Sequence, residues 1–377
     1  MIARIVIGSL FGDEGKGITT DFLCKEYPNK TIVVRFSGGQ QAGHNVKLGK
    51  YSHVHSNFGS GTLRGVPSYF SEHCTVNPVT MLREYEILSN KISTVPNVFY
   101  HPLGHLTTPA DIAYNRWRER KLQHGSCGIG VGATMKRNLE TPHKLYVIDL
   151  LNISILLEKI SQINEYYRNL IESNNGDLGD YEREFENEYY HFKNVLVPFS
   201  NWIKDKIHGY DFLNNYSNVI FEGSQGILLD MHHGVFPNVT YANTTSKNAL
   251  EICSKLKNLK GAEIEIYYVT RCYQTRHGNG WMSDESSIEL INTEHEINVF
   301  NEWQGPLRIG EIDYDLLNYV HSIDNIYSSG IKKNLVVTCL DQRPNFKLEV
   351  SKLSTQFDRI LTSHSPESKD FKNFRTK

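Results

Sequence analysis

Short apolar runs rich in β-branched and aromatic residues recur along the chain, and the first of them ends at Gly8. Such runs are typical of buried strands, while the longer segments between them carry apolar residues at helical spacing. The predicted strands are 2–7, 31–36, 97–101, 143–149, 217–222, 263–270, 334–340 and 357–362. The predicted helices are 19–27, 79–89, 108–122, 247–257 and 314–321. Alternation of strands and helices indicates an α/β fold with a mainly parallel central sheet flanked by helices.

Residues 151–213 differ from the rest of the chain because they are polar, rich in tyrosine and of mixed charge at helical spacing. Asparagine and glycine in 174–178 predict a turn between two helices. We interpret the segment as a solvated helical insertion in a single domain that spans residues 1–377. A nucleic-acid-binding surface is the less favoured interpretation.

Charge and cysteine usage exclude several classes of protein. The net charge is -2, so no global basic field indicates a nucleic-acid partner. The six cysteines form no C-x-x-C pair, which argues against a thiolate zinc site and against a disulfide scaffold. No apolar stretch approaches 18 residues, and residues 1–9 are too short for a signal peptide. We therefore expect a cytoplasmic protein without a membrane partner.

The glycine-rich segment that follows the first strand, GSLFGDEGKG at 8–17, has the placement of a phosphate-binding loop. Glycines let the backbone approach phosphate oxygens, and the next helix directs its first amides at them. Lys16 adds a positive charge, while Asp13 is able to hold Mg²⁺ or to act as a base. The spacing differs from the usual phosphate-loop motif, and Gly17 stands where a magnesium-binding hydroxyl would be. The alternative is an ordinary strand-to-helix turn with a surface lysine.

The GDEGKG loop resembles the signature loop of the adenylosuccinate synthetases, which join IMP and aspartate at the expense of GTP. Further segments resemble that family in the same order: GGQQAGHN at 38–45, GSCGIGVG at 125–132, FEGSQGILLDMHHGVFPNVTYANTT at 221–245, TRHGNG at 275–280 and TCLD at 338–341. The resemblance implies a P-loop-like nucleotide-binding fold.

The resemblance also implies the catalytic residues. Asp13 matches the family's aspartate that takes the N1 proton of the purine, so that the 6-oxygen attacks the γ-phosphate. His44 matches the histidine that protonates or hydrogen-bonds that oxygen. Asp13 and the carbonyl of Gly43 match the family's ligands to Mg²⁺.

Contacts to the nucleoside triphosphate are implied by the first loop and by a late strand. The positions that match are Gly12, Glu14, Gly15, Lys16, Gly17 and Asp341. Asp341 matches the carboxylate that reads guanine and favours GTP. Cys339 replaces the lysine that the family has two residues earlier, so ATP is the alternative.

The purine monophosphate contacts match Gln41, Ser126, Cys127, Gln225 and Thr240. Gln41 replaces an asparagine, and Ser126 with Cys127 replaces a pair of threonines that contacts the 5′-phosphate. In the family an arginine also reaches in from the partner subunit, and Arg137 is the candidate here.

Amino-acid binding departs most from the family pattern. The arginine cluster that clamps the two carboxylates of aspartate is reduced to Arg308 in WQGPLRIGEID at 303–313. Arg276 and its neighbour His277 are candidates to assist.

Four functions follow from these observations. The first is ligation of IMP to L-aspartate with GTP and Mg²⁺ in a homodimer. The second is ligation of (d)GMP to aspartate, with ATP as the triphosphate; some viral relatives act on deoxy-GMP. A viral source would place the protein in the host cytoplasm. Retention of Asp13 favours IMP, while the short chain, Cys339 and the reduced arginine cluster favour (d)GMP. A GTPase switch and an inactive homologue are the remaining alternatives.

Overall fold

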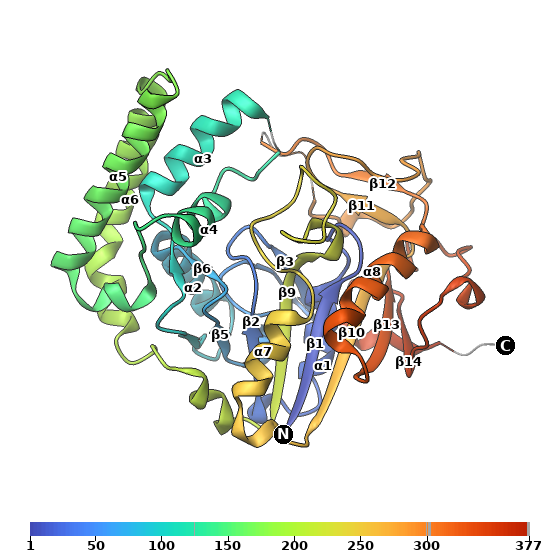
Figure 1. Cartoon of the computed structure of the whole chain (residues 1–377). Coiled ribbons are helices and arrows are strands. Elements are labelled where there is room, and N and C mark those ends of the chain that lie inside the picture. The colour runs from blue at the N-terminus through green and yellow to red at the C-terminus, as the bar shows by residue number, and fades with distance from the viewer. Residues whose placement is uncertain (124, 299, 301–302, 375–377) are drawn as a thin grey trace.

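The structure, a computed structural model, describes residues 1–123, 125–298, 300 and 303–374. Its centre is a nine-stranded sheet with the strand order β15-β14-β13-β10-β1-β9-β2-β5-β7 (Figure 1). The strands are β1 (Ile2–Gly8), β2 (Thr31–Arg35), β5 (Ser68–Phe70), β7 (Val98–Tyr100), β9 (Asn218–Gly226), β10 (Glu263–Arg271), β13 (Lys332–Thr338), β14 (Arg359–Ser363) and β15 (Phe371–Asn373). All neighbouring pairs are parallel except β14 and β15, so the predicted α/β class with a mainly parallel sheet is confirmed.

Strand β1 lies in the middle of the sheet because its β-branched residues are buried on both faces. Ile5 lies between Phe221 of β9 and Ile266 of β10. The β1–β9 pairing shifts register between Val6 and Gly8, so residues 223–225 bulge out of the ladder. A bulge redirects side chains at the end of a strand, and this one lies where the cavity described below begins.

Helices cover both faces of the sheet. They are α1 (Lys16–Cys24), α2 (Pro78–Lys91), α3 (Pro109–Leu122), α4 (Val131–Glu140), α5 (Ile153–Ser173), α6 (Gly179–Ile203), α7 (Lys247–Lys255) and α8 (Tyr314–Ser328). On one face, α7 and α8 pack through Ile252 and Leu317 against alternate residues of β1, β9 and β10. On the other face, Leu23 and Cys24 of α1 pack against Val6 and its neighbours. The alternation along the strands therefore produces a three-layer arrangement.

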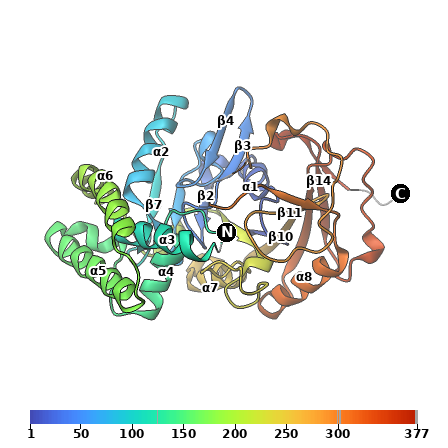
Figure 2. The ribbon, with the colours of Figure 1, turned by 90° about the horizontal axis from the view of Figure 1, so that it is seen from above.

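A second apolar cluster includes residues of α2, α3, α5 and α6, at one end of the molecule (Figure 2). Helix α5 contributes Leu156, Ile160, Ile163, Tyr167 and Ile171, which recur at helical spacing and are buried. The predicted pair of helices in 151–213 is confirmed, with residues 174–178 as the turn between them. Among the described residues no helix is both long and apolar enough to cross a membrane. The single-domain assignment stays a prediction.

The predicted strand at 143–149 is wrong, because residues 147–151 form a short 3₁₀ helix instead. The carboxylate of Asp149 accepts the backbone N–H of Tyr146 at 2.9 Å, which starts the turn. Val147 and Leu150 are then buried at a spacing of three residues. The apolar run alone predicts a strand, but the hydrogen bond from the backbone to the aspartate side chain favours a turn instead.

Several short elements were not predicted from the sequence. They are the hairpin of β3 (His44–Leu48) and β4 (Tyr51–His55), the pair β6 (Thr75–Val76) and β8 (His105–Leu106), the pair β11 (Gln274–Arg276) and β12 (Arg308–Gly310), strands β5 and β15, and helix α4. Strands of two to five residues carry too little periodicity to be recognised.

Both edges of the large sheet are short or covered. At one edge, β15 adds only three residues, antiparallel to β14. At the other edge, the N–H of Tyr100 in β7 donates to the carbonyl of Lys206, and the N–H of His208 donates to the carbonyl of Tyr100, both at 2.9 Å. The segment after α6 thus occupies the free side of β7.

Candidate functional site

A cavity of about 730 Å³ lies at the carboxyl ends of the central strands. Its wall includes the loop after β1, the bulge at the end of β9, Arg271 at the end of β10 and Thr338 at the end of β13. In open parallel sheets this edge is the usual place for a ligand, because loops and helix N-termini converge there. The wall also includes the first turns of two helices, α1 and α4.

The loop after β1 is held in shape by its own glutamate. The Glu14 carboxylate accepts the N–H of Leu10 at 2.7 Å and that of Gly12 at 3.2 Å. Burial raises the pKa of Glu14 to about 7, although the charge of Lys16 opposes the shift. Gly12 and Gly15 have φ of 100° and 98°, a region that favours glycine. Since the Glu14 side chain faces back into the loop, its predicted contact with a triphosphate would have to come from its backbone.

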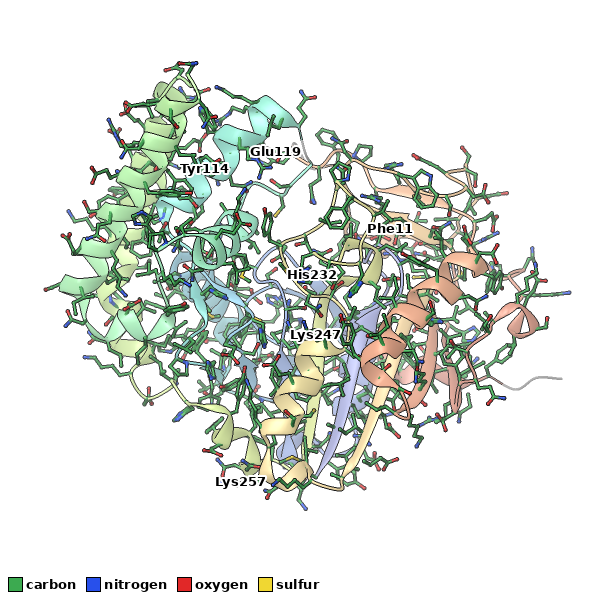
Figure 3. All side chains as sticks on the ribbon, viewed as in Figure 1. Phe11, Tyr114, Glu119, His232, Lys247 and Lys257 are labelled. Carbon is green, nitrogen blue, oxygen red and sulfur yellow. The ribbon has the colours of Figure 1, made fainter. Side chains whose placement is uncertain are left out.

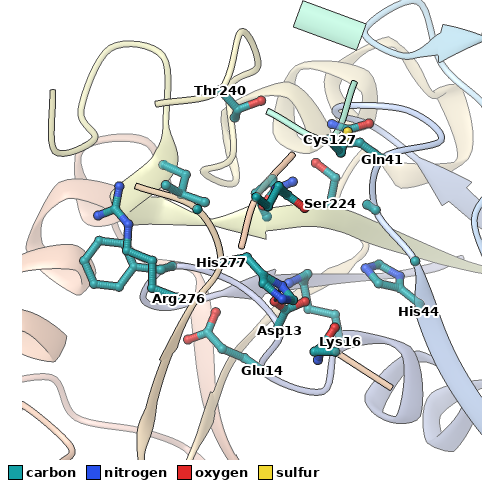
Figure 4. A pocket seen from close by; sticks show the side chains of 18 of the residues that line it. Asp13, Glu14, Lys16, Gln41, His44, Cys127, Ser224, Thr240, Arg276 and His277 are labelled. Atoms are coloured by element: carbon teal, nitrogen blue, oxygen red, sulfur yellow. Dashed lines mark hydrogen bonds and ion pairs between the residues drawn. The ribbon is translucent and has the colours of Figure 1, made fainter. Parts of the chain in front are cut away.

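Lys16 is the first residue of α1 and lines the cavity (Figure 4). Its side chain is buried, and its ammonium makes no hydrogen bond or ion pair with the described residues. Burial lowers the pKa of Lys16. Gly17 follows, and a Cβ there would lie 2.8 Å from the Cβ of His44. The absence of a side chain at Gly17 thus lets β3 approach α1.

Asp13 lies in the left-handed region with φ of 56°, and Arg271 donates to its backbone carbonyl at 2.5 Å. Its Oδ2 lies 3.0 Å from Nδ1 of His277. Burial raises the pKa of Asp13, but the hydrogen bond and charge of His277, together with the charges of Arg271 and Lys16, outweigh burial and the pKa is lowered. Asp13 is therefore ionised at neutral pH, as a base or a metal ligand must be.

His44 forms a buried pair with Glu222. Its Nδ1 lies 2.8 Å from Oε1 of Glu222, which also accepts the hydroxyl of Ser60, while Oε2 accepts the Ser60 N–H at 3.1 Å. Burial raises the pKa of Glu222, but the charge and hydrogen bond of His44, with the charge of Arg35 and the hydroxyl of Ser60, outweigh it and lower the pKa to about 2. Burial lowers the pKa of His44. Nδ1–H of a neutral His44 then donates to Glu222. Its Nε2 is buried without a partner among the described residues, and His44 lines the cavity.

The predicted metal ligands, Asp13 and Gly43, both line the cavity. A carboxylate and a carbonyl are hard oxygen donors of the kind that Mg²⁺ prefers. Oδ2 of Asp13 contacts His277, while Oδ1 makes no hydrogen bond within the described part of the chain. The donor set therefore fits Mg²⁺.

The opposite part of the cavity wall is formed by α4 and by the glycine-rich segment before it. Gly130 precedes α4 with φ of 84°, and Val131, Gly132 and Ala133 of the first turn line the cavity. Ser126 and Cys127 line it as well, and Nδ2 of Asn115 donates to the Ser126 hydroxyl at 2.9 Å. Burial raises the pKa of Cys127 to about 11, so its thiol is neutral.

Three further predicted nucleotide contacts belong to the same cavity. They are Gln41, Gln225 and Thr240, and all line the cavity (Figure 4 labels Gln41 and Thr240). Both amide atoms of Gln41 are buried and unpartnered within the described residues. A buried amide without partners is costly, and a polar ligand in the cavity would satisfy it.

The predicted base-reading residue, Asp341, also lines the cavity, and its carbonyl accepts Nδ2 of Asn292 at 2.9 Å. Cys339 lies beside it in the left-handed region with φ of 60°. Burial raises the pKa of the Cys339 thiol. The position that a lysine stem occupies in the resembled family is thus a small neutral side chain here.

The two predicted aspartate-binding arginines lie opposite each other on the β11–β12 pair. Arg276 lines the cavity, stacks 4.4 Å above the Phe11 ring and donates to the carbonyls of Trp281 and Asn238. Burial, followed by the charge of Arg308, lowers the pKa of Arg276 to about 10. Arg308 is outside the cavity wall and is paired with Glu285. Its role in binding aspartate stays a prediction and requires that pair to open.

Arg137 is wrong as the candidate for an arginine that reaches into a partner subunit. It is 1% exposed and forms a two-point ion pair with Asp111 at 2.8 and 2.9 Å. It also donates to the carbonyls of Leu106 and His143. These contacts commit the guanidinium to the interior of the helical region.

Sequence reasoning missed Glu222, Arg271 and the contact of His277 with Asp13. A signal for Glu222 exists, because a carboxylate at the end of the apolar run VIF is unusual unless it has a partner. The contact of His277 joins residues 264 positions apart, so only the fold reveals it.

Comparisons with known proteins agree with this geometry. Residues 5–354 match the family described as adenylosuccinate synthetase. The adenylosuccinate synthetase of Chlorobium chlorochromatii is 30% identical over 361 residues, which are 88% of this chain and 76% of that protein. That of Thermoplasma volcanium is 27% identical over 335 residues, with 87% and 74% covered.

Two solved structures share the fold. A fully ligated adenylosuccinate synthetase from Plasmodium falciparum superposes with a TM-score of 0.68 at 18% identity, covering 98% of this chain and 86% of that one. The succinoaminodeoxyadenylate synthetase of cyanophage S-2L, bound to dGMP and dATP as an energy donor, also gives 0.68. Its identity is 15%, with 99% and 95% covered.

Proposed function

Because the chain belongs to the adenylosuccinate synthetase family, a family of nucleotide-binding ligases that form C–N bonds in purine biosynthesis, we propose that it joins IMP and L-aspartate with hydrolysis of GTP. The observation that carries the proposal is the cavity that Asp13, Lys16 and His44 line together. One is an ionised carboxylate, one a buried cation, and one an imidazole with an unpartnered nitrogen.

The proposed reaction has two steps. Asp13 takes the proton from N1 of the purine, and the 6-oxygen then attacks the γ-phosphorus while the bond to the β-phosphate oxygen breaks. The neutral amine of aspartate next attacks carbon 6, the phosphate leaves, and the nitrogen loses a proton to solvent, which completes the C–N bond. Lys16 and the first amides of α1 stabilise the charge on the phosphates.

His44 would act on the 6-oxygen. A neutral ring that donates Nδ1–H to Glu222 presents the lone pair of Nε2 to the cavity. When Nε2 takes up a proton from solvent, ionised Glu222 stabilises the imidazolium, and its Nε2–H then donates to the negative charge that develops on the 6-oxygen. Mg²⁺ bound by Asp13 and Gly43 would neutralise phosphate charge during the transfer.

A second candidate is ligation of dGMP to aspartate, driven by ATP. The observation that favours it is Cys339, because the guanine-reading end of the cavity has lost a long apolar stem next to Asp341. The second candidate is also favoured by the reduced arginine cluster, because its one remaining member, Arg308, is paired with Glu285 outside the cavity wall. Asp13 supports IMP, because the resembled dGMP-specific enzymes typically carry a small hydroxyl residue there.

The surroundings of the enzyme stay proposals. All six cysteines are free thiols, which is consistent with the reducing conditions of a cytoplasm, or of a host cytoplasm if the source is viral. We also propose a homodimer, as the resemblance implies.

The test is phosphate release by the purified chain with Mg²⁺ and aspartate, with IMP or dGMP offered together with GTP or ATP. We expect release that requires IMP and is faster with GTP. Asp13→Asn, which keeps the shape but removes the base, is expected to lower kcat by about 10³-fold. Dependence on dGMP would replace the first candidate by the second. Release without any purine monophosphate would contradict both candidates, and unchanged release by Asp13→Asn would contradict the role of Asp13 as the base.

A further inference from the structure

Helix α3 carries three arginines, and the structure treats one of them differently from the other two. Arg116 pairs with Glu184 and Glu188 at 2.8 Å, and Arg120 pairs with Glu184. Both therefore contact α6, while Arg116 also donates to the carbonyl of Gly128 at 3.0 Å and Arg120 also lies over the Trp303 ring. Arg118 lines the cavity and makes no ion pair or hydrogen bond within the described residues. The glutamates of α6 thus satisfy two of the cations and leave the third for the cavity.

The face of α3 that carries Arg118 is fixed by its neighbours. Tyr114, Asn115, Arg118 and Glu119 all line the cavity, a spacing that places them on one side of the helix (Figure 3 labels Tyr114 and Glu119). Glu119 accepts the N–H of Gly125, and Asn115 bonds both the Ser126 hydroxyl and the N–H of Gly130 at 3.1 Å. This face is therefore joined to the segment that leads into α4.

The first turn of α4 suits an anion. Its N-terminal N–H groups have no partner within the helix, its first turn contains no acidic residue, and no side chain caps it. Gly132 adds no bulk, since a Cβ there would meet only the Tyr241 ring at 4.0 Å. The hydroxyls of Ser126 and Thr240 lie in the same cavity. A helix end, two hydroxyls and a free guanidinium are complementary to a phosphate monoester.

The other cations near the cavity either lie away from the first turn of α4 or already have partners. Lys16 belongs to the loop after β1, Arg271 pairs with Glu296 at 2.6 Å, and Arg276 is bonded to carbonyls. Lys136 of α4 lies outside the cavity wall, 3.8 Å from Glu140.

We propose that Arg118 binds the 5′-phosphate of the purine monophosphate, so that this subunit supplies from α3 the cation that the resembled family takes from its partner. The inference rests on the proposed function, because it assumes a purine monophosphate in the cavity. Arg118 is then a substrate-binding residue that leaves the γ-phosphate chemistry to Asp13 and His44.

The experiment compares a nucleotide with its nucleoside in the unaltered chain and in variants of Arg118. The phosphate is thus removed from the ligand, and the guanidinium proposed to bind it is removed from the protein. Affinities of the full chain for IMP and for inosine are measured by calorimetry, or for dGMP and deoxyguanosine if dGMP is the substrate. We expect Arg118→Ala to weaken nucleotide binding roughly 10- to 100-fold and to leave nucleoside binding unchanged. Arg118→Lys is expected to retain part of the preference.

Arg120→Ala is the matched control, because it removes an arginine from the same helix but from the face toward α6. It is expected to keep the preference for the nucleotide. In steady-state assays, Arg118→Ala should raise KM for the monophosphate and leave KM for the triphosphate and aspartate unchanged.

Two results would overturn the inference. One is an unchanged preference for the nucleotide in Arg118→Ala, and the other is loss of that preference in Lys136→Ala instead. Failure of the proposed function is recognised separately, from the phosphate-release assay on the unaltered chain. If that chain neither binds nor turns over a purine monophosphate, the proposed function fails and the inference fails with it.

Discussion

Two helices begin at the wall of the cavity, α1 at one end and α4 at the other, and each follows a glycine-rich turn. Both present free amides, but their surroundings differ. Around α1 lie ionisable side chains whose pKa values are displaced, among them Asp13, Glu14 and Glu222. Around α4 the cavity wall offers hydroxyls, a neutral thiol, one arginine and the carboxylates of Glu119 and Glu140. The same backbone device therefore supports reaction at one end and anchoring at the other.

We expect the largest difference between the two ends of the cavity in the free energy of unfolding that is lost when a buried glutamate is replaced at each end. Glu222→Gln removes a charge that His44 and Ser60 surround, and its amide would direct N–H groups at donors. We expect it to lower the free energy of unfolding by about 3 kcal/mol. Glu119→Gln keeps an oxygen for the Gly125 N–H and should cost about 1 kcal/mol or less. Urea titration measures both, and equal losses would contradict the contrast.

The Glu222 variant also has a pH signature. The folded pKa of about 2 is below the ordinary value of 4.5, so the stabilisation by this carboxylate is present above about pH 4.5 and is lost as the pH falls toward 2. The stability difference between the unaltered chain and Glu222→Gln should therefore shrink over that interval. A difference that stays constant from pH 6 to the acid transition would show that Glu222 is not ionised.

The glycines of the two turns offer the next comparison. Gly15 has φ of 98°, and a Cβ there would lie 2.7 Å from Cγ2 of Thr338. Gly15→Ala should cost about 2 kcal/mol and weaken triphosphate binding. Gly132→Ala, inside the first turn of α4, meets only the Tyr241 ring at 4.0 Å and should stabilise the chain by up to about 1 kcal/mol. Thermal unfolding of the two variants measures both effects. Similar changes in stability would show that Gly15 and Gly132 are under the same steric constraint.

The smallest expected effect concerns His277. Its hydrogen bond and charge lower the pKa of Asp13 against the effect of burial, so His277→Ala should raise that pKa. Less Asp13 is then ionised at a given acidic pH, and the acid limb of the kcat profile moves to higher pH. At pH 8 the loss should be less than about tenfold, because the charges of Arg271 and Lys16 still oppose the effect of burial on the pKa of Asp13. His277→Asn is the control that keeps a donor; an unmoved acid limb would indicate that His277 does not act through Asp13.

The parts of the fold that could be predicted are those that local sequence encodes. Strand β1 and its loop are recognisable because an apolar run and a cluster of glycines lie next to each other in the chain. The prediction of a strand at 143–149 is wrong because the carboxylate of Asp149 accepts the backbone N–H of Tyr146, and this hydrogen bond starts a turn. The hairpin that carries His44 was missed because its strands are short and carry few apolar residues.

The site was predictable where residues lie in the loops themselves and not where partners come from afar. His44 and Glu222 are 178 residues apart, so neither predicts the other. Arg137 and Arg118 lie on neighbouring helices and look alike in sequence, yet one is buried against Asp111 and the other lines the cavity. The two arginines differ in which face of its helix each occupies, and this depends on how each helix packs in the fold.

The edges of the large sheet have a consequence for how the protein behaves at high concentration. An exposed strand edge offers free backbone groups to another chain and is a starting point for aggregation. Here the carbonyl of Lys206 and the N–H of His208 already occupy the free side of β7, and the opposite edge is the three-residue strand β15. The fold therefore offers little template for edge-to-edge growth, although its central strands are among the most apolar parts of the chain.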